Sequence, residues 1–238
     1  MNNTLNIFGM LLAATFLFHA TLSYMTDNIV DFETVALPPK RIEPSATRNP
    51  TVRVDAASRD VWTLLDFATG KTYSIQDPEK EKARLNEFKW DLGFQRTKII
   101  TNGGETNPRG AVGVVNLGKI DIDDVKEAPE TGYLADTNAW GKLNNPSLAD
   151  WYLYRTRTHN IESQKNVYVA RTADKSYVKF RILNYYCNQN ESDCATAMCP
   201  RDEAACITLE YVRQPSGERI FPAPVARESV AAIPSDRD

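Results

Sequence analysis

The sequence predicts an all-β domain, either an antiparallel sandwich or a barrel-like pair of sheets, preceded by one N-terminal transmembrane helix. Short segments alternate apolar and polar residues with a period of two, and they are rich in β-branched and aromatic residues. No regular alternation of strands with helices is present, which excludes a doubly wound sheet. The expected strands cover residues 51–55, 60–67, 71–75, 88–94, 96–101, 111–117, 150–155, 166–172, 176–185 and 207–212.

Composition and charge exclude several classes of function. The chain has 238 residues, of which 42% are hydrophobic and 25% charged, as in globular proteins of one or two domains. The formal net charge is −3, so the chain has no basic excess with which to bind nucleic acid. Its two histidines, His19 and His159, belong to different segments and cannot build a multi-histidine metal site.

Enzyme motifs are also missing from the sequence. It contains no G-x-S-x-G, nucleotide-binding glycine loop or H-E-x-x-H. The acidic run at Asp121, Asp123 and Asp124 lacks the glycine of a calcium loop, so we expect a solvated turn there. We therefore expect a protein that is not an enzyme and holds no metal.

The N-terminal segment of residues 1–26 is expected to be a membrane helix. Residues 7–24 carry no formal charge, and their length lies near the lower end of a membrane span, which is about 17–25 residues. A cleaved signal peptide is the alternative, but the preceding residues include no Lys or Arg. His19 would lie near the membrane interface, or would contact a neighbouring helix or a cofactor.

Proline-rich segments flank the expected β domain of residues 51–213. Residues 27–50, which include Pro38 and Pro39, are expected to form an extended strap, and residues 214–238 an irregular C-terminal arm. Neither segment has the periodicity of a core element. Both are long enough to lie across a partner, so we expect Pro38 and Pro39 to contact one.

Trp140 is the best candidate for an exposed aromatic contact. It lies in the polar stretch of residues 136–146, which has no strand pattern. Most other aromatic residues occur at strand spacing and are expected to pack in the core or on a sheet face. We therefore expect Trp140 to anchor a protein interface.

The cysteines predict disulfides and an oxidising compartment. The four residues are spaced C-x6-C-x4-C-x6-C, without the C-x2-C pairs of zinc ribbons, and they permit three connectivities. Because the flanking strands are expected to form a hairpin, we expect Cys187 to pair with Cys206 and Cys194 with Cys199. Such bridges place the domain outside the cytoplasm, so the expected location is the bacterial inner membrane with the C-terminal domain in the periplasm.

Several segments, in this order, resemble the HmuY-like family of extracytoplasmic β proteins, whose best-known members are bacterial haemophores. The resemblance covers roughly residues 60–186 and implies an all-β fold and a pair of loops that face haem. The matching segments are D-F-A-T-G-K at residues 66–71, W-D-L-G-F-Q-R at 90–96, I-T-N-G-G at 100–104, D-W-Y at 150–152, N-V-Y-V-A-R-T-A-D at 166–174 and Y-V-K-F at 177–180.

The resemblance also implies which residues would hold haem. Family members that bind haem use two axial His or Met side chains from two loops, and this domain offers His159 and Met198. Neither lies at an obvious equivalent of the family's paired positions, and no lipoprotein cysteine follows the apolar run. The first hypothesis is therefore a non-enzymatic accessory subunit without a cofactor, which stabilises a larger membrane complex, for example an electron-transfer or photosynthetic one. Its expected partners are integral membrane subunits and the bilayer. The alternative is a haem- or tetrapyrrole-binding protein of the haemophore type.

Overall fold

The computed structural model describes residues 6–22, 49–139, 141–194 and 197–223. The chain divides into two compact units, residues 1–44 and 45–238, which are treated separately here. Trp140, Pro38 and Pro39, the expected partner contacts, lie outside the described residues. Nothing in the structure therefore bears on their predicted roles.

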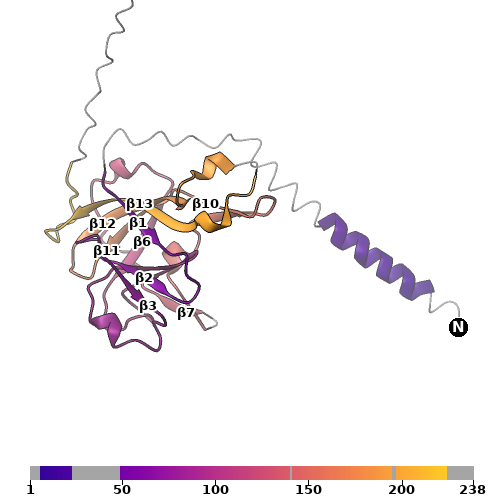
Figure 1. Ribbon diagram of the computed structural model, residues 1–238, viewed down its shortest axis with the longest axis horizontal. Coiled ribbons are helices and arrows are strands. Elements are labelled where there is room, and N and C mark those ends of the chain that lie inside the picture. Colours follow the sequence, from indigo (N-terminus) through magenta and orange to yellow (C-terminus); the bar gives the residue numbers. More distant parts are fainter. Residues whose placement is uncertain (1–5, 23–48, 140, 195–196, 224–238) are drawn as a thin grey trace, which may run out of the picture. The chain divides into compact units, whose positions relative to one another are not determined.

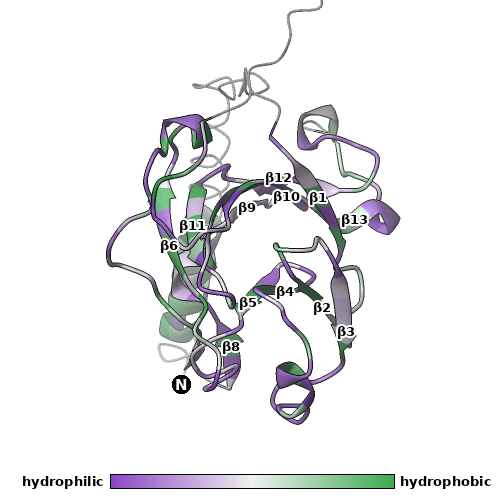
Figure 2. Cartoon of the chain, turned by 90° about the vertical axis from the view of Figure 1, so that its left-hand side faces the viewer, coloured by the Kyte–Doolittle hydropathy of each residue, from purple (hydrophilic) through white to green (hydrophobic). Residues whose placement is uncertain are grey.

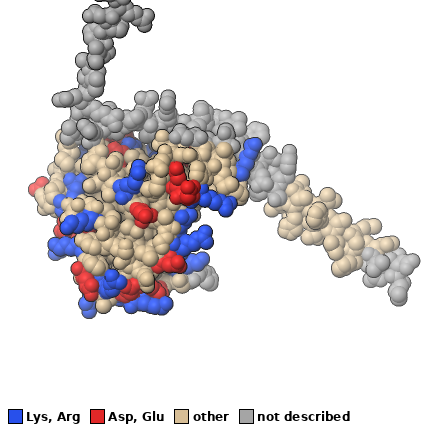
Figure 3. All heavy atoms as spheres, in the orientation of Figure 1, with Lys and Arg blue, Asp and Glu red and all other residues tan. Residues whose placement is uncertain are grey.

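The first unit contains one described helix, residues 6–22, which carries no charged side chain and is shown in Figures 1 and 3. His19 is exposed on this helix, and its ring centroid lies 6.2 Å from that of Phe18. Of the helices described, none combines the length and the apolar character needed to cross a membrane. The predicted transmembrane span over residues 7–24 is therefore corrected to a helix over residues 6–22.

The second unit is built from short antiparallel strands. All ten segments expected from the sequence overlap a strand, and three further strands, β7, β8 and β10, were not predicted. The strands are β1 Thr51–Asp55, β2 Trp62–Leu65, β3 Thr72–Ile75, β4 Leu92–Gln95, β5 Lys98–Thr101, β6 Gly113–Gly118, β7 Thr137–Ala139, β8 Lys142–Asn144, β9 Tyr152–Arg155, β10 Asn160–Ser163, β11 Val167–Arg171, β12 Tyr177–Tyr186 and β13 Ala204–Gln214.

The strands form two larger sheets and two hairpins. One sheet has the order β1-β13-β12-β11-β6 and the other β3-β2-β4-β5, while β9 pairs with β10 and β7 with β8. In Figure 2 the five-stranded sheet arches over the four-stranded one. None of the sheets formed by the described strands closes into a barrel, so the barrel-like alternative is not realised.

Apolar side chains from both larger sheets share one buried cluster. Phe180 of β12 and Val54 of β1 lie in the same cluster as Leu65 of β2 and Phe94 of β4, and all four are fully or almost fully buried. Burying each such side chain stabilises the fold by about 1.5–3 kcal/mol. The hydrophobic cluster therefore joins the two sheets into one β unit.

Five single turns of 3-10 helix complete the fold. The charged stretch of residues 78–88 contains one of them. The acidic run forms another, in which the Asp121 carboxylate accepts a hydrogen bond from the backbone N–H of Asp123 at 2.9 Å. The turns are η1 Arg84–Asn86, η2 Ile122–Asp124, η3 Pro146–Leu148, η4 Glu191–Cys194 and η5 Arg201–Glu203.

The T-N-G-G segment owes its glycines to a close backbone approach. Gly104 has φ +60°, and a Cβ added there would lie 2.2 Å from the carbonyl oxygen of Asp136. The buried Asp136 carboxylate in turn accepts hydrogen bonds from Thr101 and Thr106. The T-N-G-G segment therefore has a structural role, because only glycine allows the backbone at residue 104 to come so close to the backbone at Asp136.

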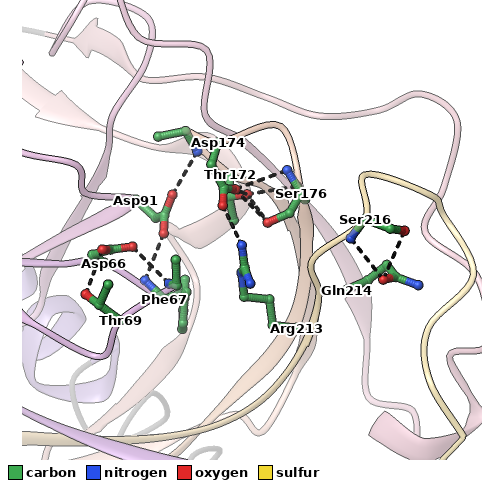
Figure 4. Close-up of polar contacts among 12 residues, drawn as sticks. Asp66, Phe67, Thr69, Asp91, Thr172, Asp174, Ser176, Arg213, Gln214 and Ser216 are labelled. Carbon is green, nitrogen blue, oxygen red and sulfur yellow. Dashed lines mark hydrogen bonds and ion pairs between the residues drawn. The ribbon is translucent and has the colours of Figure 1, made fainter.

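The W-D segment supplies a link between the two sheets, which Figure 4 shows. The Asp91 carboxylate accepts hydrogen bonds from the backbone N–H of Phe67 at 2.9 Å and of Ala173 at 2.8 Å. Burial raises the pKa of Asp91 to about 6, and these two hydrogen bonds oppose that shift. A carboxylate thus ties the turn after β2 to the turn between β11 and β12.

The pKa of the neighbouring Asp174 is shifted in the opposite direction. Its partial burial disfavours ionisation, but hydrogen bonds from Ser176 and Thr172 and the ion pair with Arg213 outweigh that effect and lower its pKa. The β11–β12 turn is therefore held by an ionised carboxylate on its own residues, as Figure 4 also shows.

Candidate functional site

His159 lies in the turn of the β9–β10 hairpin, immediately before β10. Its backbone is left-handed, with φ +57°, an uncommon conformation for a residue other than glycine, and its side chain is exposed. Its imidazole Nδ1 lies 2.6 Å from the hydroxyl oxygen of Tyr154, which belongs to the paired strand β9. The hairpin therefore presents the imidazole at the surface while holding one ring nitrogen in a fixed direction.

The contact with Tyr154 is compatible with either neutral tautomer of the imidazole, because the hydroxyl can donate to Nδ1 or accept from it. When Nδ1 carries the proton and donates it to the Tyr154 oxygen, Nε2 keeps a lone pair. Metal-binding histidines commonly donate their second ring N–H in this way to an oxygen acceptor. In that tautomer, His159 has the form of a metal ligand whose orientation is fixed by a neighbour.

Met198 lies in a small loop closed by the disulfide between Cys194 and Cys199. Its side chain is 49% exposed. Asn160, the residue after His159, fixes this loop: its amide nitrogen donates to the carbonyl oxygens of Cys194 and Ala197, and its amide oxygen accepts from the backbone N–H of Cys199, all at 2.8 Å. One buried side chain thus holds the Met198 loop against the residue next to His159.

A second anchor lies at the start of the same loop. Lys165, just after β10, forms an ion pair of 2.7 Å with Glu191 of η4, and both side chains are largely buried. Burial raises the pKa of Glu191, and the positive charge of Lys165 opposes that shift. The hairpin itself is tied to β12, because the Ile161 N–H donates to the Tyr186 hydroxyl at 2.9 Å. The segment that leads into the disulfide loop is therefore linked to the residue after β10, and β10 is linked to β12.

The surface at this hairpin is partly apolar. Leu153 and Tyr154 of β9 expose 41% and 46% of their surface, and Met198 is similarly exposed. Because successive side chains of a strand point to opposite faces, Leu153 and Tyr154 present their exposed atoms on two sides of the hairpin. We refer to His159, Tyr154, Leu153 and Met198, together with the positioning residue Asn160, as the hairpin rim.

The structure places the two predicted site residues on adjoining segments, and three further residues belong to the hairpin rim. The sequence singled out His159 and Met198 by their chemistry. It offered no signal for Asn160, whose partners are backbone atoms 34–39 positions further along the chain. Tyr154 was assigned only to general sheet packing, and Leu153 was noted only as part of a strand.

The expected bridge between Cys187 and Cys206 is absent, and both residues are free thiols. A β-bulge shifts the β12–β13 pairing, so the N–H of Cys187 donates to the carbonyl of Glu203, and Cys206 lies beside Asp55 of β1. The two thiols still interact, since a hydrogen bond to Cys187 contributes to the pKa of Cys206. The hairpin argument therefore found the right pair of neighbours but the wrong covalent state.

Comparisons with known proteins agree with this fold. The family model described as HmuY protein matches residues 58–198. A HmuY analog from Tannerella forsythia, solved in its apo form, shares 17% identity with a TM-score of 0.55, over 71% of this chain and 97% of that chain. Apo PinO from Porphyromonas gingivitis shares 14% identity with a TM-score of 0.53, over 70% of this chain and 97% of that one. A comparison with curated proteins gives no match.

Proposed function

The chain belongs to the HmuY family, and we propose that its β domain binds haem or a related tetrapyrrole, whose iron His159 and Met198 would hold. The observation that supports this most directly is the position of Asn160, which ties the loop of Met198 to the residue beside His159. Two side chains 39 positions apart in the sequence thereby lie on adjoining segments. They are the donor types that the family resemblance implied.

The chemistry of the hairpin rim fits a haem group. An imidazole nitrogen and a thioether sulfur are an established pair of axial ligands. Tyr154 contacts the imidazole, and the exposed part of its ring offers apolar surface to a porphyrin. Bound haem would supply a redox-active iron with a strong visible absorption. The protein's own part is to bind and orient the group.

A binding role is favoured over the accessory-subunit hypothesis. The family match covers the β domain, whereas the contacts expected with membrane subunits were assigned to His19 and to three residues outside the described part of the chain. We also propose that the domain works outside the cytoplasm, without catalysis. The disulfide between Cys194 and Cys199 supports that location.

Haem titration of the full chain tests this function. Wild-type protein is expected to shift the Soret band of added haem and to give a six-coordinate spectrum. His159→Ala should lose most of the affinity, and Met198→Leu, which keeps the apolar surface, should give a five-coordinate spectrum.

The chain supplies matched controls for both substitutions. His19→Ala and Met10→Leu remove the same side-chain types from the N-terminal helix, and they should leave the titration unchanged. If wild-type protein and the His159 and Met198 variants all bind haem equally, the ligands are assigned wrongly. If wild-type protein does not shift the Soret band at all, the proposed function itself is wrong.

A further inference from the structure

A pocket of about 410 Å³ is lined by Cys187, one of the two free thiols, and by none of the hairpin rim residues named above. Strands β1, β12 and β13 contribute to its wall, together with the chain that follows β12. Arg53 and Thr208 lie opposite each other in the β1–β13 ladder, and Asn184 is paired with Thr208 on the other side. The lining residues are Arg53, Leu183, Asn184, Cys187, Asn188, Gln189, Asn190 and Thr208.

The two thiols at this pocket are not equivalent. Cys187 lines the pocket and is partly exposed, whereas Cys206 is 7% exposed and does not line it. Burial raises the pKa of Cys206 to about 12, and the hydrogen bond and charge of Cys187 add to that effect, while Arg53 opposes it and Asp55 reinforces it. Cys206 therefore keeps its proton at neutral pH. Only Cys187 is placed to meet a reagent that enters from solvent.

The lining of the pocket favours a small polar ligand. Arg53 supplies a positive charge, and the side-chain amides of Asn184 and Asn188 add donors and acceptors. The Asn184 amide nitrogen donates to the carbonyls of Tyr186 and Gln189, but its buried oxygen has no hydrogen-bond partner. A guanidinium binds carboxylate well, so Arg53 favours a ligand that carries a carboxylate.

We propose that this pocket is a thiol–disulfide exchange site, at which Cys187 reacts with a small disulfide that carries carboxylate and amide groups and Cys206 completes the exchange. The argument rests on the pocket, on the contact between the two thiols, and on their different exposure. It is independent of haem binding, because neither cysteine belongs to the hairpin rim.

The exchange balances in two steps. The Cys187 thiolate attacks one sulfur of the small disulfide, so that the S–S bond of the reagent breaks, a mixed disulfide forms on Cys187, and the first small thiolate leaves and takes up a proton. Cys206 then loses its proton and attacks the Cys187 sulfur. The second small thiolate leaves, and a Cys187–Cys206 disulfide remains. Overall the two protein thiols are oxidised, and the small disulfide is reduced to two thiols.

Intact mass spectrometry with oxidised glutathione tests this scheme on the full chain, starting from protein in which Cys187 and Cys206 are free thiols. Wild-type protein is expected to lose two hydrogen atoms and to retain no glutathione. Cys206→Ala should accumulate one glutathione adduct on Cys187, whereas Cys187→Ser should acquire neither an adduct nor a bridge. Peptide mapping should show the Cys194–Cys199 bridge intact throughout.

Arg53→Gln tests the carboxylate contact separately, and should react several-fold more slowly with oxidised glutathione while reacting at the wild-type rate with neutral 2-hydroxyethyl disulfide. The proposal is overturned if folded Cys206→Ala protein forms no adduct, or if Cys187→Ser is modified as readily as wild type. Equal slowing of both reagents by Arg53→Gln would overturn the assignment of a carboxylate-bearing ligand. Far-UV circular dichroism of each variant verifies that it is folded.

Discussion

Replacing Asn160 with alanine is expected to lower the free energy of unfolding by about 3 kcal/mol. Asn160 is buried and makes three hydrogen bonds of 2.8 Å to the backbone of the disulfide loop. Each buried hydrogen bond of this kind contributes about 1 kcal/mol net, and the loss grows where the freed backbone groups stay dry. For a domain of this size, 3 kcal/mol corresponds to a melting temperature lower by about 6–12 °C.

Urea unfolding monitored by tryptophan fluorescence measures this loss, with the disulfide left intact. Hydrogen exchange at the Cys199 amide reports the loop itself, because that N–H donates to Asn160 and should lose protection in the variant. Asn138→Ala is the matched control, since Asn138 is exposed and its side chain makes one long hydrogen bond to Glu79. That control should stay within about 0.5 kcal/mol of wild type.

The reasoning about Asn160 would be refuted by a variant that unfolds at the same urea concentration as wild type and keeps its Cys199 amide protected. Such a result would mean that the disulfide alone holds the loop of Met198. A destabilised variant with an unprotected amide, in contrast, should also bind haem more weakly, because the two candidate ligands would no longer be held on adjoining segments.

Three further outcomes follow from buried groups and close contacts. The pKa of Asp91 is raised to about 6, so between pH 4 and 6 the folded protein keeps a proton on this carboxyl that the unfolded chain has released. The stability of wild type relative to Asp91→Asn should therefore fall by about 3 kcal/mol as the pH rises from 4 to 7. A stability difference that stays constant with pH in urea titrations contradicts this. Arg181→Met should cost about 3–5 kcal/mol, because it leaves the buried Glu210 carboxylate without the partner that now lies 2.6 Å away; thermal melts should show recovery in the double variant with Glu210→Leu, and no recovery would argue against a buried charge as the cause. Gly104→Ala should cost at least about 2 kcal/mol more than Gly70→Ala in the same melts, because both glycines have positive φ but only Gly104 abuts a backbone carbonyl, and equal losses would exclude that contact.

The alternation of apolar and polar residues was enough to predict most of the sheet. A residue pattern of period two reflects strands that bury one face, and β-branched and aromatic residues fill the strands buried on both, such as β12. The missed strands β7, β8 and β10 are short and mostly polar, so they lack this signal. Strand order was also beyond the sequence, because pairings such as β1 with β13 join segments about 150 residues apart.

Two other predictions failed for a geometric reason. The apolar N-terminal run predicted a helix, and a helix is present, but no helix among the described residues combines the length and the apolar character needed to cross a membrane. The cysteine spacing identified which residues are neighbours. A β-bulge, which no spacing rule reveals, determined that Cys187 faces Glu203.

The sequence by itself determined which donors this domain can offer to an iron, because the described β unit contains one histidine, His159, and one methionine, Met198. Only the tertiary structure decided that they lie on adjoining segments. The physical reason is that Asn160 is buried, and its amide must satisfy both its donors and its acceptor with backbone groups of the disulfide loop. Local sequence cannot encode that contact, since it depends on how β10 and the loop are both supported by β12.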